Sequence, residues 1–134
     1  MNKKAIIAVL AIVAAAGIYF SANSPKAVGG AAASSEQAAS NVMTLYYSPT
    51  CPHCHKARAF LAKIEKKYPG VKFEQVNTST RDGSAQYFAA RQSLNIQQEG
   101  VPLAVFGGKN YILGYGDDAT SGARYEEYIK ELAK

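Results

Sequence analysis

Both cysteines and both histidines of the chain lie in one five-residue run, Cys51-Pro52-His53-Cys54-His55. Cysteines three positions apart serve three kinds of chemistry: a structural disulfide, a metal site or a reactive dithiol. A disulfide between Cys51 and Cys54 would close a very small loop and remove little entropy from the unfolded chain, so it would stabilise a fold poorly. Zinc usually takes four ligands from two separated pairs, and the sequence has no second pair. The pattern therefore favours a reactive dithiol and no dedicated metal site.

The position of the cysteines predicts which of them attacks. The thiolate is the species that attacks a disulfide, and Cys51 is expected at a helix N-terminus, where unpaired N–H groups and the helix dipole favour negative charge. Pro52 suits the first helical turn because its missing N–H is not needed there. We expect Cys51 to attack, and Cys54, one turn deeper and more buried, to resolve the mixed disulfide. We expect His53 to support the thiolate with a donor or a positive charge, whereas His55 is expected to be a solvent-exposed helix residue.

The surrounding pattern predicts the elements that hold this motif. In chain order it indicates a buried strand at 42–47, a helix from Pro52 that ends at Pro69-Gly70, a strand at 71–77, a helix at 84–94, strands at 103–106 and 110–115, and a closing helix near 125–132. The helix at 84–94 is expected to bury Ala85, Phe88 and Ala89. A helix between the first two strands requires a parallel crossover, and the glycines at 107–108 suit a hairpin. The fold class is therefore α/β, a four-stranded mixed sheet with three helices on both sides.

Two stretches, SPTCPHCHKARAFL and GVPLAVFGGKNYILGYGDD, resemble the thioredoxin superfamily in a compact glutaredoxin-like version, over about Val42 to Lys134. The resemblance implies a thioredoxin-like fold and a redox-active Cys51–Cys54 disulfide that needs no other cofactor. The Cys-Pro-His-Cys motif resembles that of the DsbA-type oxidants of the bacterial periplasm. Val101-Pro102 occupies the place of the family's cis-proline. This implies that Val101 and Pro102 lie beside the dithiol, with the Val101 backbone pairing with an extended substrate chain.

The sequence also departs from its relatives in three places. Thr50 precedes the first cysteine where thioredoxins have tryptophan, and Leu45 occupies the position of the buried acid that accepts a proton from the resolving cysteine. Only forty-seven residues separate Cys54 from Pro102, which is room for one strand and one helix and not for the helical insertion of DsbA-type enzymes. The glycines and aspartates at 114–118 partly match a glutathione-binding pattern, so glutathione is kept as a candidate ligand, although a turn followed by a helix cap explains them equally well.

The N-terminal part of the chain predicts export. Lys3 and Lys4 precede sixteen uncharged residues, AIIAVLAIVAAAGIYF. This pattern indicates a signal peptide or signal anchor at residues 1–20, with a retained anchor favoured and the remainder of the chain on the extracytoplasmic side. The Ala-, Ser- and Gly-rich stretch at residues 21–41 is expected to be a flexible linker, followed by the thioredoxin-like domain at residues 42–134.

These observations combine into one functional hypothesis. The net charge is +5, but no cluster of lysine and arginine is interleaved with aromatic residues, so a nucleic-acid partner is not expected. We expect an extracytoplasmic thiol–disulfide oxidoreductase, in the periplasm or on the outer face of the cell membrane, that oxidises protein thiols. The sequence has no cysteine outside the motif, which suits an oxidising compartment because a further thiol could form a wrong disulfide there. The alternatives are a reductase supplied with electrons by a membrane redox partner, and a copper- or zinc-handling module that uses the same cysteines.

Overall fold

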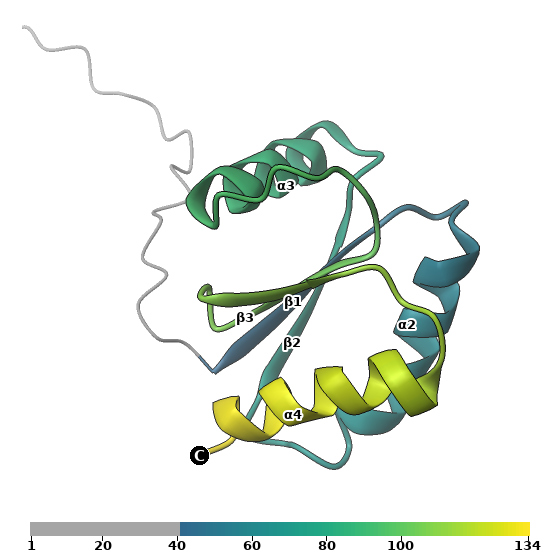
Figure 1. The fold of residues 1–134 in the computed structure, drawn as a ribbon, viewed down its shortest axis with the longest axis vertical. Coiled ribbons are helices and arrows are strands. Elements are labelled where there is room, and N and C mark those ends of the chain that lie inside the picture. Colours follow the sequence, from purple (N-terminus) through teal and green to yellow (C-terminus); the bar gives the residue numbers. More distant parts are fainter. Residues whose placement is uncertain (1–40) are drawn as a thin grey trace, which may run out of the picture. The chain divides into compact units, whose positions relative to one another are not determined.

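The computed structural model describes residues 41–134 of the chain. The predicted signal segment, and the predicted linker except for its last residue, lie outside the described residues. None of the helices between residues 41 and 134 is long and apolar enough to cross a membrane. The elements are, in order, β1 (Val42–Tyr47), α2 (Pro52–Ile64), β2 (Lys72–Asn77), α3 (Arg81–Ser93), β3 (Leu103–Phe106), β4 (Asn110–Leu113), the π-helical turn η1 (Asp118–Gly122) and α4 (Ala123–Leu132) (Figure 1).

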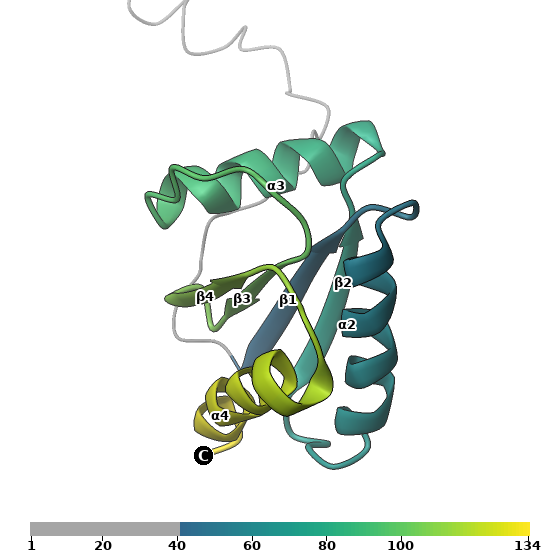
Figure 2. The same cartoon turned by 45° about the vertical axis from the view of Figure 1, so that its right-hand side comes forward.

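The four strands form one mixed sheet in the order β2-β1-β3-β4. β1 pairs in parallel with β2, whereas β1 with β3 and β3 with β4 are antiparallel. The helices α2 and α4 cover one face of the sheet and α3 covers the other (Figures 1 and 2). This is the thioredoxin-like α/β fold that the sequence predicted, with four strands and three α-helices.

Alternate residues along the strands point to the two faces, so the core divides into two clusters. In β1, Met43 and Leu45 face α2 and α4, while Tyr46 faces α3. In β3, Phe106 belongs to the first cluster and Val105 to the second. The buried members of the α2/α4 cluster are Met43, Leu45, Ala57, Phe60, Leu61, Ile64, Val71, Ala104, Phe106, Ile112, Tyr115, Tyr125 and Ile129. The buried members of the α3 cluster are Tyr46, Tyr87, Ala90, Ile96, Leu103 and Val105.

The prediction of which residues of the second helix, α3, face the core is wrong. The helix α3 begins at Arg81, three residues before the expected start, because the Thr80 hydroxyl caps it by accepting the Gly83 N–H at 3.0 Å. Its buried residues are Gly83, Tyr87 and Ala90. The three residues that were expected inside, Ala85, Phe88 and Ala89, are exposed, and Phe88 is 50% exposed. Phe88 is the more apolar of two neighbouring aromatic residues, but Tyr87 is the one that is buried. The Tyr87 hydroxyl can be buried because it forms hydrogen bonds with Gly100.

Two other boundaries also differ from the expected ones. The helix α2 ends at Ile64, and a turn at 65–67 follows, whereas the sequence predicted that the helix would continue to Pro69-Gly70. The strand β4 ends at Leu113, before the expected end at residue 115, because Gly114 has a φ of 86° and turns the chain out of the sheet. These differences leave the order of the elements unchanged.

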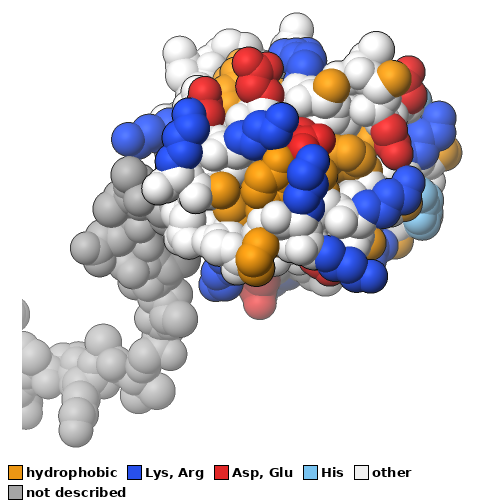
Figure 3. Space-filling view, turned by 90° about the horizontal axis from the view of Figure 1, so that it is seen from below, with side chains coloured by type: hydrophobic (Ala, Val, Ile, Leu, Met, Phe, Trp, Pro, Cys, Tyr) orange, Lys and Arg blue, Asp and Glu red, His pale blue; other side chains and the backbone are white. Residues whose placement is uncertain are grey.

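Ion pairs are dispersed over the surface. The face shown in Figure 3 carries acidic and basic side chains interspersed around hydrophobic ones. Among the ion pairs are Lys63 with Asp118, Lys67 with Glu126, and Arg91 with Glu99. Each has at least one exposed partner, so solvent screens the attraction and each pair contributes little to stability. The two apolar clusters therefore stabilise the fold more than the surface charges do.

Candidate active site

The dithiol lies at the junction between the central strand β1 and the helix α2. Cys51 is the N-cap residue of α2, with φ −89° and ψ 116°, and Pro52 follows in the first turn. The Cys51 N–H donates to the Ser48 carbonyl at 3.2 Å, which closes the turn between strand and helix. The Cys51 Sγ accepts the Cys54 N–H at 3.3 Å. The sulfur therefore occupies the position where unpaired helix N–H groups stabilise a negative charge, as the sequence predicted.

The two thiols have different surroundings. Cys51 is half-buried and reaches solvent, whereas Cys54 is 1% exposed, and both thiols are free. Burial raises the pKa of the Cys54 thiol to about 12, and its hydrogen bond with Cys51 adds to the increase. Leu45, at the position of the expected acid, is fully buried in a strand that has no carboxylate. Cys54 therefore remains protonated at neutral pH, and Cys51 is the accessible sulfur.

The Val101-Pro102 peptide is cis and lies beside the dithiol. The Cys51 thiol donates to the Val101 carbonyl over 3.6 Å, although fifty residues separate the two in the sequence. Pro102, the next residue, is buried. The structure thus brings together Cys51, Val101 and Pro102, as the resemblance implied.

The side chain of His53 forms a hydrogen bond with the segment that follows β4. Its Nδ1 lies 2.8 Å from the Tyr115 carbonyl oxygen, and because a carbonyl can only accept, this nitrogen carries the proton. No hydrogen bond joins His53 to Cys51 within the described part of the chain. His53 therefore links the first turn of α2 to the segment after β4, and its effect on the thiolate stays a prediction. His55 is exposed, as expected.

The carboxylates of the loop at 114–118 have structural partners. Asp117 caps η1 by accepting the Thr120 N–H at 2.7 Å and its hydroxyl at 2.8 Å, which holds the pKa of Asp117 below its usual value. Asp118 accepts the Tyr115 hydroxyl at 2.7 Å, and this bond, together with Lys63, lowers the pKa of Asp118. The turn-and-cap interpretation therefore accounts for both aspartates.

Sequence reasoning missed two tyrosines around the site. Tyr115 presents its carbonyl to His53 across sixty-two positions of the sequence, and no local pattern reveals such a contact. Tyr87 was missed because the register of α3 was read wrongly, although Thr80 three residues before Gly83 is a capping signal that would have corrected it. Between residues 41 and 134, no three His, Cys, Asp or Glu side chains are grouped so that they could hold a metal ion.

Known proteins resemble this chain in sequence and in fold. The family model described as Glutaredoxin matches residues 43–111, about half of the chain. A protein described as "Probable Thioredoxin" from Archaeoglobus fulgidus is 34% identical over 77 residues, which cover 58% of this chain and 77% of that protein.

Two solved structures show the same fold at low sequence identity. The oxidized form of thioredoxin O2 from Arabidopsis thaliana has a TM-score of 0.52 at 22% identity, covering 69% of this chain and 75% of that one. The oxidized form of thioredoxin O1 from the same plant has a TM-score of 0.51 at 16% identity, covering 69% and 78%. Together with the cysteine pair at the N-terminus of α2, these matches show that the chain belongs to the glutaredoxin family, within the thioredoxin superfamily of thiol redox proteins.

Proposed function

We propose that this protein oxidises the thiols of other proteins by disulfide exchange, on the extracytoplasmic side of a membrane. The observation that carries this proposal is the asymmetry of the two sulfurs. Cys51 is accessible and caps a helix, while Cys54 is buried with a raised pKa. A substrate can therefore reach one sulfur only, and the other completes the exchange inside the protein.

In the proposed reaction a substrate thiolate attacks Cys51 in the Cys51–Cys54 disulfide. The bond between the two cysteines breaks, Cys54 leaves with the electron pair and takes up a proton, and a mixed disulfide joins Cys51 to the substrate. A second substrate thiolate then attacks the substrate sulfur of the mixed disulfide, and Cys51 leaves as a thiolate. The substrate gains a disulfide, and the two electrons it loses reduce the protein's dithiol.

The proposed direction follows from the position of Cys51 at the N-terminus of α2. The Cys54 N–H, at 3.3 Å, and the N-terminus of α2 stabilise a thiolate at Cys51 but give little to a neutral disulfide. Stabilising the reduced form makes the disulfide a stronger oxidant. The reduced protein is then returned to its disulfide form by an external oxidant, for which a disulfide-bearing redox partner at the membrane is the expected class.

The substrate is proposed to bind beside Val101. A peptide in extended conformation can pair with the Val101 backbone, next to the Cys51 sulfur that lies 3.6 Å from the Val101 carbonyl. Backbone pairing places a substrate cysteine near Cys51 without specific contacts to most of the substrate's side chains. Broad specificity toward protein thiols follows.

The location is proposed from the sequence. Lys3 and Lys4 before a long uncharged stretch favour export, and the presence of no further cysteine favours an oxidising compartment. Treating intact cells first with a membrane-impermeant phosphine reductant, which opens the Cys51–Cys54 disulfide, and then with a membrane-impermeant maleimide, which labels Cys51, tests this proposal. Labelling without cell lysis is the expected result, and labelling only after lysis would contradict the location.

A redox titration and one variant test the reaction. Equilibration with glutathione buffers should give a reduction potential above about −200 mV, toward the oxidising end of the range for such dithiols. A value near about −270 mV would instead favour the reductase alternative.

The Cys51→Ala variant should lose disulfide transfer to reduced ribonuclease completely, because it lacks the sulfur that the substrate attacks. Circular dichroism and thermal unfolding serve as controls that the fold is retained. Full activity in this variant would overturn the assignment of Cys51.

A further inference from the structure

The segment that brings Val101 to the dithiol has no regular structure of its own. We call residues 95–100, between the end of α3 and Val101, the return loop. The loop begins with Asn95 at a φ of 51°, a left-handed conformation that asparagine tolerates. The position of Val101 beside Cys51 therefore depends on whatever holds this loop in place.

The Tyr87 hydroxyl binds the last residue of the return loop at both of its backbone groups. It donates to the Gly100 carbonyl at 3.1 Å and accepts the Gly100 N–H at 3.0 Å. A phenol hydroxyl can donate one hydrogen bond and accept another, so a single side chain satisfies both groups. Gly100 directly precedes Val101, whose carbonyl lies 3.6 Å from Cys51 Sγ. The double hydrogen bond and the contact with the reactive sulfur thus lie on adjacent residues.

The Tyr87 ring itself is held by its neighbours. It is 8% exposed and packs edge-on against Tyr46, with ring centroids 5.9 Å apart. Tyr46 belongs to β1, the strand that leads to the dithiol turn. The guanidinium of Arg91 lies 5.5 Å from the centre of the Tyr87 ring. The hydroxyl is therefore presented to Gly100 from a buried and packed base.

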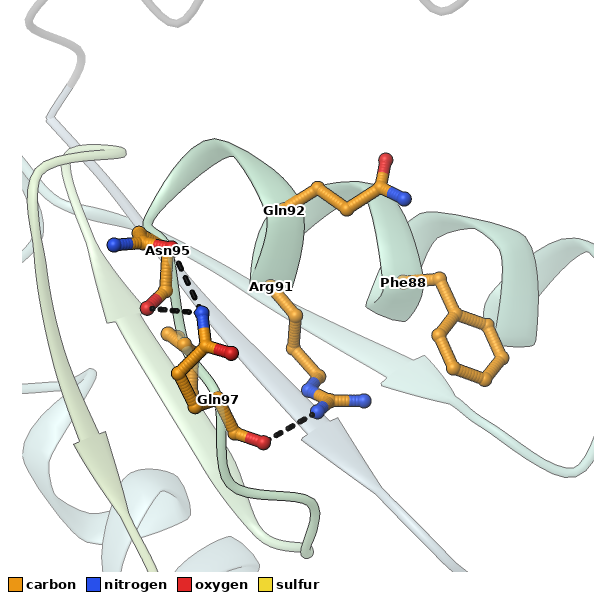
Figure 4. Close-up of a pocket in the computed structure, with 6 residues that line it drawn as sticks. Phe88, Arg91, Gln92, Asn95 and Gln97 are labelled. Carbon is orange, nitrogen blue, oxygen red and sulfur yellow. Dashed lines mark hydrogen bonds between the residues drawn. The ribbon is translucent and has the colours of Figure 1, made fainter.

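A second residue of α3 binds the middle of the same loop. Figure 4 shows the Arg91 side chain extending from α3 to the return loop, where it donates to the Gln97 carbonyl at 3.2 Å. Arg91 also pairs with Glu99 at 2.7 Å. The Phe88 ring lies on the same side of α3, with its centre 5.9 Å from the Arg91 guanidinium. α3 therefore holds the return loop at Gln97, Glu99 and Gly100, and Tyr87 makes the bond nearest to the site.

We propose that Tyr87 is a positioning residue for protein substrates: its hydroxyl holds Gly100 so that the Val101 backbone is presented to the substrate chain beside Cys51. This inference rests on the proposed function. Its role concerns binding of an extended chain and not the sulfur chemistry, because its hydroxyl binds Gly100 and forms no hydrogen bond with either cysteine in the described part of the chain. A small disulfide that needs no backbone pairing should therefore react independently of Tyr87.

The Tyr87→Phe variant tests the proposal because it removes the hydroxyl and keeps the ring. With a reduced dithiol peptide as substrate, KM should increase about 5- to 30-fold, the effect of losing one to two hydrogen bonds, because the variant lacks both bonds to Gly100, while kcat is unchanged. The rate at which reduced Cys51 reacts with a small aromatic disulfide should remain within about twofold of the wild-type rate, because a small disulfide does not pair with the Val101 backbone and so does not depend on the Tyr87 hydrogen bonds. The Gly100 amide, followed by NMR, should exchange its hydrogen about 5-fold faster because it loses its bond to the hydroxyl.

The Tyr68→Phe variant is the matched control. It loses a tyrosine hydrogen bond of similar length, 2.8 Å to Glu126, at the opposite end of α2 from Cys51. Its KM for the peptide should equal that of wild type, which separates positioning from a general loss of stability.

Each result decides a different part of the inference. Unchanged exchange at the Gly100 amide of Tyr87→Phe would overturn the hold on the loop. Faster amide exchange with an unchanged KM would overturn the role in substrate binding, and so would an equal increase of KM in Tyr68→Phe. A wild-type protein without any exchange activity would contradict the proposed function instead, and the Gly100 amide would then decide alone whether Tyr87 holds the loop.

Discussion

The two faces of the sheet are packed by different means. On the α2/α4 face, aromatic rings contact one another edge to face: Phe106 and Tyr125 have centroids 5.6 Å apart, and Tyr115 and Tyr125 are 5.2 Å apart. Such pairs add to the free energy of burial and allow little movement. On this face the helix that carries the dithiol rests on a thick apolar layer.

The α3 face has a smaller apolar cluster, and two of its polar side chains form hydrogen bonds with the return loop. Its single helix packs Tyr87 and Ala90 on the sheet and uses the Tyr87 hydroxyl and the Arg91 guanidinium to bind the return loop. Phe88 on the same helix is exposed. We infer that the two faces have different roles: the α2/α4 face stabilises the helix that carries the dithiol, and the α3 face positions the return loop beside the proposed substrate site.

The largest expected effect is a loss of stability on the α2/α4 face. Phe106→Ala should lower the free energy of unfolding by about 4 kcal/mol, because Phe106 is 1% exposed and contacts two tyrosine rings. Ile96→Ala, in the smaller cluster, should cost about 2 to 3 kcal/mol. Urea unfolding followed by circular dichroism measures both.

Activity should separate the same two variants in the opposite order. Per folded molecule, Phe106→Ala should keep the wild-type KM for a dithiol peptide, whereas Ile96→Ala should raise it because Ile96 anchors the return loop. An increase of KM in Phe106→Ala that matches or exceeds that in Ile96→Ala would break the division between the faces.

A second comparison uses one glycine from each face. At Gly83 of α3, an added Cβ would lie 2.0 Å from the Asn77 carbonyl oxygen, so the backbone of the helix would have to move. At Gly122, before α4, the added Cβ would lie 2.9 Å from a carbon of the Phe60 ring and 3.0 Å from the Tyr115 hydroxyl oxygen, so side chains, and not the backbone, would have to move. We expect Gly83→Ala to cost about 3 kcal/mol and Gly122→Ala about 1 kcal/mol. Thermal unfolding measures the difference, and a larger cost at Gly122 would show that the α2/α4 layer is the less adaptable one.

The last prediction concerns the pH dependence of Cys54, which should leave the stability of the fold unchanged. In a mixed disulfide of Cys51 with thionitrobenzoate, the Cys54 thiolate attacks Cys51 and releases the coloured anion. Because burial raises the pKa of Cys54 to about 12, the thiolate fraction increases with pH throughout the range below that value. The release rate should therefore rise about tenfold per pH unit between about pH 7 and 10, without levelling off near the usual cysteine pKa of about 8.5.

The control for this measurement is Cys54→Ser, which should show no release. A rate that becomes constant near about pH 8.5 would mean that Cys54 ionises like a free cysteine. In that case the burial of Cys54 would have no consequence for the exchange reaction.

Most of the fold could be predicted because its signals are local. The apolar run of β1, the proline after Cys51 and the glycines before β4 each indicate an element or a turn from a few neighbouring residues. The order of the elements and the parallel crossover then follow from chain connectivity. The prediction failed at α3, where Phe88 was placed inside because its hydrophobicity was weighed without knowledge of the partners that allow Tyr87 to be buried.

By itself, the sequence determined the dithiol, the helix that it caps and the order of the elements along the chain, because these depend on residues adjacent in the chain. Only the tertiary structure decided which groups surround the dithiol. The contacts of Cys51 with Val101, of His53 with Tyr115 and of Tyr87 with Gly100 join segments that lie on different elements. Such contacts form only when the helices pack on the sheet, and their geometry depends on the register of each helix, which burial and hydrogen bonding set together.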